Sequence, residues 1–385
     1  MDTLAQNSGL FDELFQGIYG LADVGILAMF VVGFILMFLA VRYDYEPMLL
    51  FPMGIGCVLA NIPGHYAVLQ DPGSEGFLYV LYKAGIANEL FPVMIFIAIG
   101  AMCEFDPLMR KPFVMLFAAA AQFGIFMTAF LATLLGFPFN QAASIGIIGA
   151  ADGPTSILVS QVLHSSYVGP IAVAAYSYMA LVPIIQPFAI KLVTTKKERR
   201  IRMPYNPKNV SRTLRICFPI LVTIIAGFIA PMSVSLVGFL MFGNLLRECG
   251  CLDRLSETAQ NTLANLITLL LGITISFSMR ADQFVSRNTL IIMGLGLVAF
   301  VFDSIAGVMF AKLLNLFSKK KVNPMVGAAG ISAFPMSARV IQKMGLEADP
   351  QNHLLMHAVG ANVAGQIASV LAGGMILNLV PQLLK

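Results

Sequence analysis

One apolar stretch of the chain carries side chains that could bind a cation. Gly149-Ala-Ala-Asp152-Gly-Pro154-Thr155-Ser156 places a carboxylate, a proline and two hydroxyls within eight residues. Proline lacks an amide donor and disfavours helix at the residue before it, so we expect the helix to break there. The freed carbonyls, the hydroxyls and Asp152 would form an oxygen-rich site that suits a hard cation such as Na⁺. A kink with a protonated Asp152 is the alternative, but an acid in a membrane segment is costly and typically functional.

A second stretch repeats this pattern 181 positions later. At that offset Gly146, Gly149, Pro154 and Ser156 fall on Gly327, Gly330, Pro335 and Ser337, and Phe51–Gly56 similarly resembles Val237–Gly243. The second copy replaces the acid by neutral oxygens on Asn323 and Ser332 and adds a cation, Arg339. Two crossing broken segments would bring these groups near Asp152. Arg339 would then either pair with Asp152 or present its planar fork to a substrate carboxylate.

Two phenols, Tyr176 and Tyr178, precede Pro183 in another apolar segment. A tyrosine in such a helix is more often a packed side chain with one satisfied hydroxyl. The matching stretch of the other half, Gly360–Gln366, is also polar, which strengthens the functional interpretation. Asp303 and Glu89 are further acids in apolar segments. Neither lies in a broken motif, so we expect both to be structural.

The composition is that of a membrane protein. The 385 residues are 58% hydrophobic and 11% charged, with mean hydropathy +0.82, whereas a soluble domain carries about 25% charged residues. Twelve hydrophobic segments are expected, at 22–42, 47–62, 77–104, 113–136, 141–163, 167–194, 214–231, 233–247, 257–278, 288–317, 323–343 and 353–380. The five cysteines and four histidines form neither a disulfide framework nor a metal motif. We find no motif for nucleic acid, a nucleotide phosphate or zinc.

A basic linker divides the two similar halves. Lys191 to Arg215 contains nine Lys or Arg residues against one acid, Glu198, which predicts a cytoplasmic location. This charge is typical of a topology signal and of attraction to anionic lipid rather than of a specific binding surface. The predicted organisation is a polar segment at 1–20, a membrane repeat at 21–194, the linker at 195–213 and a second repeat at 214–385.

The predicted fold is an all-α polytopic membrane protein with 10–12 membrane segments and discontinuous helices. Duplicated halves are the usual plan of secondary transporters. Six full crossings in each half would make the repeats parallel, whereas a re-entrant broken segment would make them inverted. We favour the inverted arrangement.

From about Phe15 to Leu379 the sequence resembles the β subunits of sodium-translocating, biotin-dependent decarboxylases, which act in complexes on oxaloacetate, glutaconyl-CoA or methylmalonyl-CoA. The resemblance is carried by Ile148–Thr155, Ala174–Pro187, Asn323–Arg339 and Gly360–Gly365. It implies that the protein decarboxylates carboxybiotin, consumes a proton and exports Na⁺ across the bacterial cytoplasmic membrane. The family residues tied to ion and proton handling fall on Asp152, Tyr178, Asn323, Gly327, Ser332 and Arg339. It implies catalysis by Asp152, Tyr178 and Arg339, Na⁺ binding by Asp152, Asn323, Gly327 and Ser332, and carboxybiotin binding by Arg339.

The resemblance also implies partners. The chain contains no Met-Lys-Met sequence of the kind that holds biotin, so carboxybiotin is expected in trans from a biotin carboxyl carrier. A soluble carboxyltransferase α subunit, a small membrane γ or δ subunit and a homo-oligomer within the complex are expected as well. The short link at Pro63–Gly76 favours the branch that acts on CoA thioesters, because oxaloacetate members carry a long insertion there. From residue types alone, a Na⁺-coupled carrier of a small carboxylate anion remains the alternative.

Overall fold

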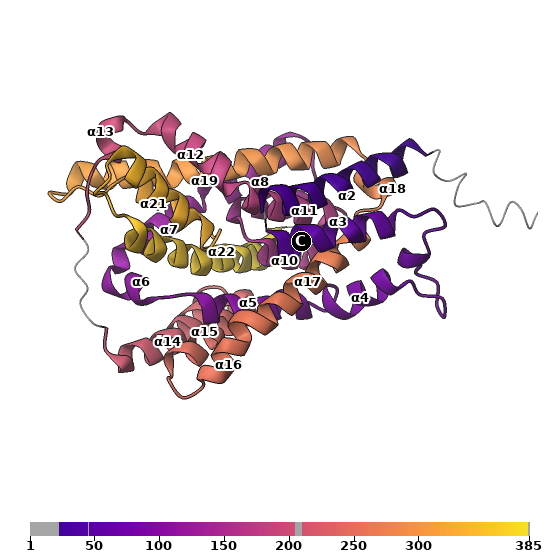
Figure 1. Ribbon diagram of the computed structural model, residues 1–385, viewed down its shortest axis with the longest axis horizontal. Helices are drawn as coiled ribbons and strands as arrows, with labels where there is room; N and C mark the ends of the chain where they lie inside the picture. Colours follow the sequence, from indigo (N-terminus) through magenta and orange to yellow (C-terminus); the bar gives the residue numbers. More distant parts are fainter. Residues whose placement is uncertain (1–22, 45, 205–209, 384–385) are drawn as a thin grey trace, which may run out of the picture. The chain divides into compact units, whose positions relative to one another are not determined.

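The computed structural model describes residues 23–44, 46–204 and 210–383, which form helices, helical turns and connecting loops without a strand (Figure 1). Six helices of these ranges are long and apolar enough to cross a membrane, and bent pairs of helices bring the number to eight. The six are Val24–Tyr43, Pro112–Leu134, Arg212–Ile229, Asp253–Ser278, Arg287–Phe317 and Leu355–Leu383. The structure therefore confirms an all-α polytopic membrane protein.

The twelve expected segments correspond to helical stretches, but they are not twelve full-length helices. Segment 77–104 is a pair of helices bent by 61°, and segment 167–194 is a pair bent by 73°. Segment 47–62 forms a helix of only 14 residues, and segment 233–247 forms one of 15. The remaining two, 141–163 and 323–343, are broken near their centres. Eight of the twelve expected segments are thus single helices or bent pairs long enough to cross a membrane. The other four are short helices or broken segments, and hydropathy does not register where a helix stops within an apolar stretch.

The described residues group into two compact units, 23–91 with 265–290, and 92–264 with 291–383. The first unit contains α2 (Val24–Tyr43), α3 (Pro47–Ala60), η1 (Tyr66–Val68), α4 (Phe77–Gly85), most of α17 (Ala264–Ile275), η6 (Ser276–Ser278) and α18 (Ala281–Phe284). The predicted repeat boundaries divide the chain by sequence similarity rather than by packing, and they stay a prediction. The predicted polar segment 1–20 lies outside the described residues.

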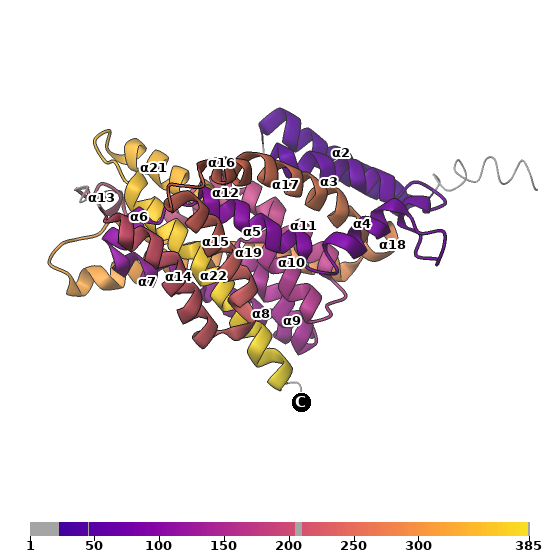
Figure 2. The same cartoon turned by 90° about the horizontal axis from the view of Figure 1, so that it is seen from below.

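Within the first unit, α2 and α3 lie side by side (Figures 1 and 2). Helix α2 begins at a capping residue, because the carboxylate of Asp23 accepts a hydrogen bond from the amide of Gly25 at 2.7 Å. The end of α3 is tied to the start of α18 through Asn61. Its side-chain amide donates to the carbonyl of Met279 at 2.7 Å and accepts from the amide of Ala281 at 2.8 Å.

The second unit contains the remaining helices and the main hydrophobic core. In chain order these are α5 (Leu90–Met102), whose first two residues belong to the other unit, α6 (Asp106–Arg110), η2 (Pro112–Val114), α7 (Met115–Ala121), α8 (Phe123–Leu134), α9 (Phe139–Gly146), η3 (Ile147–Ala150), α10 (Gly153–Val162), α11 (Val168–Ala180), α12 (Val182–Val193), α13 (Lys196–Arg199), α14 (Arg212–Ile229), η4 (Pro231–Ser233), α15 (Val234–Glu248), α16 (Asp253–Thr258), η5 (Ala259–Leu263), most of α19 (Arg287–Phe317), α20 (Met325–Ala328), α21 (Met336–Ala348) and α22 (Leu355–Leu383).

Helix α22 is the central element of the second unit. Buried residues occupy 72% of its membrane window, compared with 11% for α14, and it contacts α7, α10 and α21. A helix buried on most of its surface can carry polar side chains only if other buried groups pair with them. This requirement places the polar residues of α22 against the two broken segments.

Candidate functional site

The first broken segment stops being helical directly before Asp152. Helix α9 continues into the 3-10 turn η3, after which Ala151 has a left-handed backbone with φ of 51° and Asp152 is extended. Asp152 then caps α10, and its carboxylate accepts a hydrogen bond from the amide of Thr155 at 3.3 Å. The predicted break is confirmed, but it lies before Gly153 rather than at it. Pro154 falls in the first turn of α10, where a missing amide donor costs nothing.

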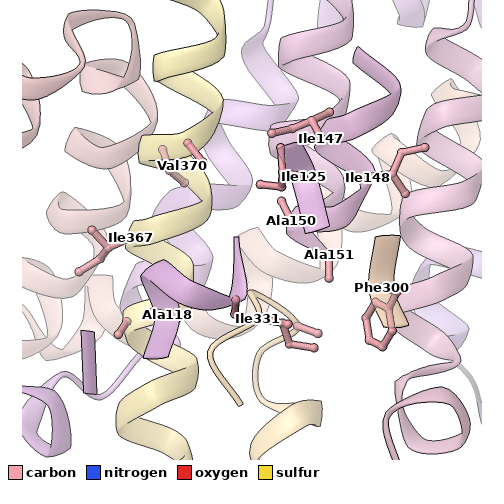
Figure 3. Close-up of a cluster of buried hydrophobic side chains, with 14 of the residues drawn as sticks. Ala118, Ile125, Ile147, Ile148, Ala150, Ala151, Phe300, Ile331, Ile367 and Val370 are labelled. Carbon is pink, nitrogen blue, oxygen red and sulfur yellow. The ribbon is translucent and has the colours of Figure 1, made fainter. Parts of the chain in front are cut away.

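The second broken segment is interrupted for longer. Helix α20 ends at Ala328, residues 329–335 are not helical, and α21 begins after Pro335 as predicted. The two breaks meet, since the amide of Ser332 donates to the carbonyl of Ala150 at 3.3 Å. Figure 3 shows Ala151 and Ile331 at the two breaks, with α22 passing beside them. The apolar side chains around the breaks keep their backbone away from lipid.

Four oxygen-bearing side chains surround the point where the breaks meet. The Asp152 carboxylate accepts hydrogen bonds from the hydroxyls of Thr155 at 2.7 Å, Ser369 at 3.1 Å and Ser332 at 3.4 Å. The hydroxyls of Ser369 and Ser332 lie 3.0 Å apart. Asp152 is 3% exposed and the three hydroxyl residues are 0–2% exposed. A single carboxylate with neutral oxygens, all out of contact with solvent, suits a hard monovalent cation.

Helix α22 supplies two further oxygens next to this cluster. The side-chain amide of Gln366 donates to the carbonyl of Ser332, and that of Asn362 donates to the carbonyl of Ile331 at 2.6 Å. These bonds fix both side chains against the second break. Their own carbonyl oxygens, Gln366 Oε1 and Asn362 Oδ1, are buried and accept no hydrogen bond from any described residue. Since a buried oxygen without a donor is unfavourable, these atoms are well suited to a cation.

The structure brings together only part of the predicted site. Asp152 and Ser332 meet although 180 positions separate them. Ser369 is a member of the cluster that sequence reasoning missed, and Asn362 and Gln366 were noted only as polar. Thr155 was expected in the site, as one of the two hydroxyls of the first broken segment. A signal existed in the sequence, because Asn362, Gln366 and Ser369 recur at spacings of four and three, which place them on one face of a helix.

Asn323 and Gly327 lie elsewhere in the fold. The Asn323 side chain donates to the carbonyls of Arg199 and Ile201, both at 2.9 Å, and accepts from the amide of Met325. It therefore anchors the basic linker at the start of α20. Gly327 packs its backbone against Gly307 of α19, where a Cβ atom would overlap the neighbouring backbone. The structure gives these residues an anchoring and a packing role, and their part in Na⁺ binding stays a prediction.

Arg339 does not pair with Asp152. It lies exposed on α21, in a groove with Gln342, Lys343 and Leu355, and makes no ion pair with the described residues. Of the two roles open to it from the sequence, neutralising Asp152 is not observed. Its exposure leaves the guanidinium accessible to a group brought by another molecule.

The two phenols of α11 have different surroundings. The hydroxyl of Tyr178 donates to the carbonyl of Met293 on α19. The ring of Tyr176 packs against Gly153, the residue after Asp152, where a Cβ atom would overlap the ring. Tyr176 is thus in direct contact with the first break, whereas Tyr178 faces α19.

Asp303 is a second fully buried acid. Its carboxylate lies between two glycines, Gly124 of α8 and Gly149 of η3, and occupies the space that side chains would take there. Among the described residues, neither oxygen finds a hydrogen-bond donor in normal geometry, although the amide of Gly124 faces the carboxylate. Asp303 is therefore packed against the back of the first broken segment.

One hydrogen-bond pattern recurs in both halves. The hydroxyl of Ser156 lies 3.4 Å from the carbonyl oxygen of Ile147, across the first break. The hydroxyl of Ser337 lies 3.5 Å from the carbonyl oxygen of Ala328, across the second. Both atoms of the second pair lie 181 positions after those of the first, the offset found in the sequence. This match supports an internal duplication, while the inverted orientation stays a prediction.

Known proteins are similar to this chain over nearly all of its length. Residues 25–380 match the family model of the Na⁺-transporting oxaloacetate decarboxylase beta subunit. Methylmalonyl-CoA decarboxylase subunit beta of Veillonella parvula is 48% identical over 365 residues, which cover 93% of this chain and 96% of that protein. Glutaconyl-CoA decarboxylase subunit beta of Acidaminococcus fermentans is 47% identical over 356 residues, 92% of this chain and 93% of that protein. The oxaloacetate decarboxylase beta chain of Klebsiella pneumoniae is 42% identical, and the alignment covers 96% of this chain and 98% of that protein.

Nearly the whole chain is covered by these similarities, and its membrane helices contain a buried oxygen cluster suited to Na⁺. The chain therefore belongs to the family of Na⁺-transporting decarboxylase beta subunits, the membrane part of a sodium pump.

Proposed function

We propose that the protein decarboxylates carboxybiotin, supplied by a carrier subunit, and uses the reaction to export Na⁺ bound at the Asp152 cluster. The observation that carries this proposal is the meeting of two broken segments around one buried carboxylate and three hydroxyls. Such a site is chemically matched to Na⁺, and broken helices at membrane depth are how transporters expose backbone and side-chain oxygens to ions. The relevant ligands are Asp152, Thr155, Ser332 and Ser369, with the carbonyl oxygens of Asn362 and Gln366 as additional candidates.

The chemistry needs an anion-binding group and a proton donor. When carboxybiotin loses CO₂, the bond between the carboxyl carbon and the ring nitrogen breaks, and its electron pair stays on the nitrogen, which takes up a proton. We assign the carboxylate of carboxybiotin to Arg339, whose planar fork is exposed and forms no ion pair with the part of the chain that the structure describes. We assign proton donation to Tyr178, since a phenol with an ordinary pKa of about 10 stays protonated at neutral pH. Tyr178 must then break its hydrogen bond to the carbonyl of Met293 and donate its proton to the ring nitrogen of biotin instead.

The protein acts as one subunit of a larger complex in the cytoplasmic membrane of a bacterium. The partners that we propose are a biotin carboxyl carrier, a soluble carboxyltransferase and a small membrane subunit. The substrate of the complex is a CoA thioester in this proposal. Relatives named for CoA esters are 46–48% identical, whereas the Klebsiella oxaloacetate relative is 42% identical. The alignment with that relative extends over 428 positions, more than the 385 residues of this chain, as an insertion in the relative requires.

The test uses the Asp152→Asn variant of the reconstituted complex. Without the carboxylate, Na⁺ uptake into vesicles and Na⁺-stimulated decarboxylation should both fall by at least 100-fold. Carboxyl transfer to the carrier, which takes place on a soluble partner, should stay at the wild-type rate and serves as the control. Wild-type Na⁺ uptake by Asp152→Asn would refute the assignment of the site.

A further inference from the structure

Six cations form a continuous surface on the second unit, which we call the basic face. It consists of Lys191, Lys196, Arg199, Arg200, Arg339 and Lys343. The end of α12, helix α13 and the outer side of α21 contribute these residues, and α21 contacts both α12 and α13 (Figures 1 and 2). Two cavities lie in this face. One of 280 Å³ is lined by the first four cations, and one of 570 Å³ is lined by Arg339 and Lys343.

The charge of the basic face is largely uncompensated. Glu347, which borders both cavities, is the acid among the residues that line them. Lys191, Lys196 and Lys343 are exposed and make no ion pair with any described residue. Nearby charges are neutralised instead. Lys312 pairs with Glu198 at 3.0 Å, and Arg202 pairs with Asp349 at 2.6 Å and holds the pKa of that carboxyl below its usual value. The positive field is therefore concentrated around the groove of Arg339.

The basic face is also fixed in position. The Arg199 guanidinium donates to the carbonyl of Thr194 at 2.8 Å, and that of Arg200 donates to the carbonyl of Ala348 at 3.1 Å. The second bond joins the linker to the end of α21. Charges held on packed helices form a shaped surface, whereas charges on a mobile tail attract any anion. The concentration of positive charge here is thus better suited to a defined partner than the sequence pattern alone suggests.

We propose that the basic face binds an acidic surface of the biotin-carrying partner and directs its carboxybiotin into the groove of Arg339. This inference rests on the proposed function. The linker lies on the side that the positive-inside rule assigns to the cytoplasm, where both a soluble partner and anionic lipid are found. Two observations favour a protein over an anionic lipid. Glu347 separates the cavities and would repel a phosphate, but a protein surface can match mixed charges. Leu346 and Leu355 line the groove of Arg339 and suit an apolar bicyclic ring.

The test compares carrier-bound with free carboxybiotin in the complete complex. The double variant Lys191→Glu and Lys196→Glu changes only the cavity next to the groove of Arg339 and leaves every residue that lines this groove in place. We expect carrier-dependent decarboxylation to fall about 10-fold or more at low ionic strength, because charge reversal opposes electrostatic docking. Decarboxylation of free carboxybiotin should stay within twofold of wild type. The matched control is Lys320→Glu, an exposed lysine that lines a separate cavity with Lys111.

Three outcomes would overturn the docking proposal, and a fourth would overturn the proposed function. Unchanged carrier-dependent turnover would show that the basic face does not bind the partner. An equal loss with free and carrier-bound substrate would indicate an effect on chemistry or folding. A loss seen only in membranes rich in anionic lipid, and not in neutral lipid, would make a lipid headgroup the occupant. If wild-type complex fails to decarboxylate free carboxybiotin, the proposed function itself fails, independently of this surface.

Discussion

Replacing Ser369 by alanine tests whether the hydroxyl cluster binds Na⁺. The Ser369 hydroxyl lies 3.1 Å from the Asp152 carboxylate, 3.0 Å from the Ser332 hydroxyl and 3.0 Å from the backbone carbonyl oxygen of Gln366. It thus links the first break, the second break and α22. Ser369→Ala removes one oxygen from the site and releases Ser332, while the backbone of α22 keeps its packing. We therefore expect weaker Na⁺ binding with an intact fold.

The expected loss of Na⁺ affinity follows from the negative charge of the Asp152 carboxylate, which accepts the hydrogen bond of Ser369. A hydrogen bond to a charged group contributes about 1.5–3 kcal/mol. If that amount is lost from Na⁺ binding, the dissociation constant rises about 10- to 150-fold. The assays are the Na⁺ concentration that gives half-maximal decarboxylation and the Na⁺-dependent rise in thermal unfolding midpoint. The maximal rate at saturating Na⁺ should fall much less, because Ser369 is not assigned to the chemistry.

Ser160→Ala is the matched control for this experiment. Ser160 is as fully buried as Ser369, but its hydroxyl donates to the carbonyl of Ser156 in its own helix at 2.7 Å. We expect its Na⁺ dependence to be that of the wild type. A half-saturating Na⁺ concentration within twofold of wild type for Ser369→Ala would show that the cluster is a structural hydrogen-bond network and that Na⁺ binds elsewhere.

Four further predictions concern residues with distinct surroundings. Tyr178→Phe should lower the rate of decarboxylation by orders of magnitude and leave Na⁺-dependent protection from thermal unfolding intact. Tyr176→Phe keeps the ring on Gly153 and should retain activity. The reverse result would assign proton donation to Tyr176. Asn323→Ala should loosen the linker, which limited proteolysis would detect. A rise of more than threefold in half-saturating Na⁺ would support the predicted part of Asn323 in Na⁺ binding, and an unchanged value would limit its role to anchoring. Gly327→Ala should lower stability by about 1–3 kcal/mol through overpacking against α19, measured as a lower unfolding midpoint, and an unchanged midpoint would contradict the close helix contact. Asp303→Asn should pump Na⁺ within threefold of the wild-type rate, and a severe loss would give that buried acid a role in transport.

The sequence by itself determined the class of the protein and the positions of its breaks. Low charge and long apolar runs require helices in a membrane, because only internal hydrogen bonds can satisfy the backbone there. Pro335 marks the second break, and Pro154 marks the first to within a few residues, since proline acts on its own neighbourhood in the chain. Asp152 stood out because an acid is rare in such a segment. All of these signals are local.

Only the tertiary structure decided which groups meet. Ser369 reaches Asp152 across 217 positions, and no local pattern specifies that contact. Asn323 has a side-chain oxygen that could bind a cation, but the fold places the amide of Met325 against that oxygen and the linker carbonyls against its NH2 group. Arg339 is the cation nearest the second break in sequence, yet α21 turns it outward, away from Asp152. Residue type and spacing determine what a side chain can do. The packing of distant helices determines what it touches, because a buried polar group must pair with whatever the fold places beside it.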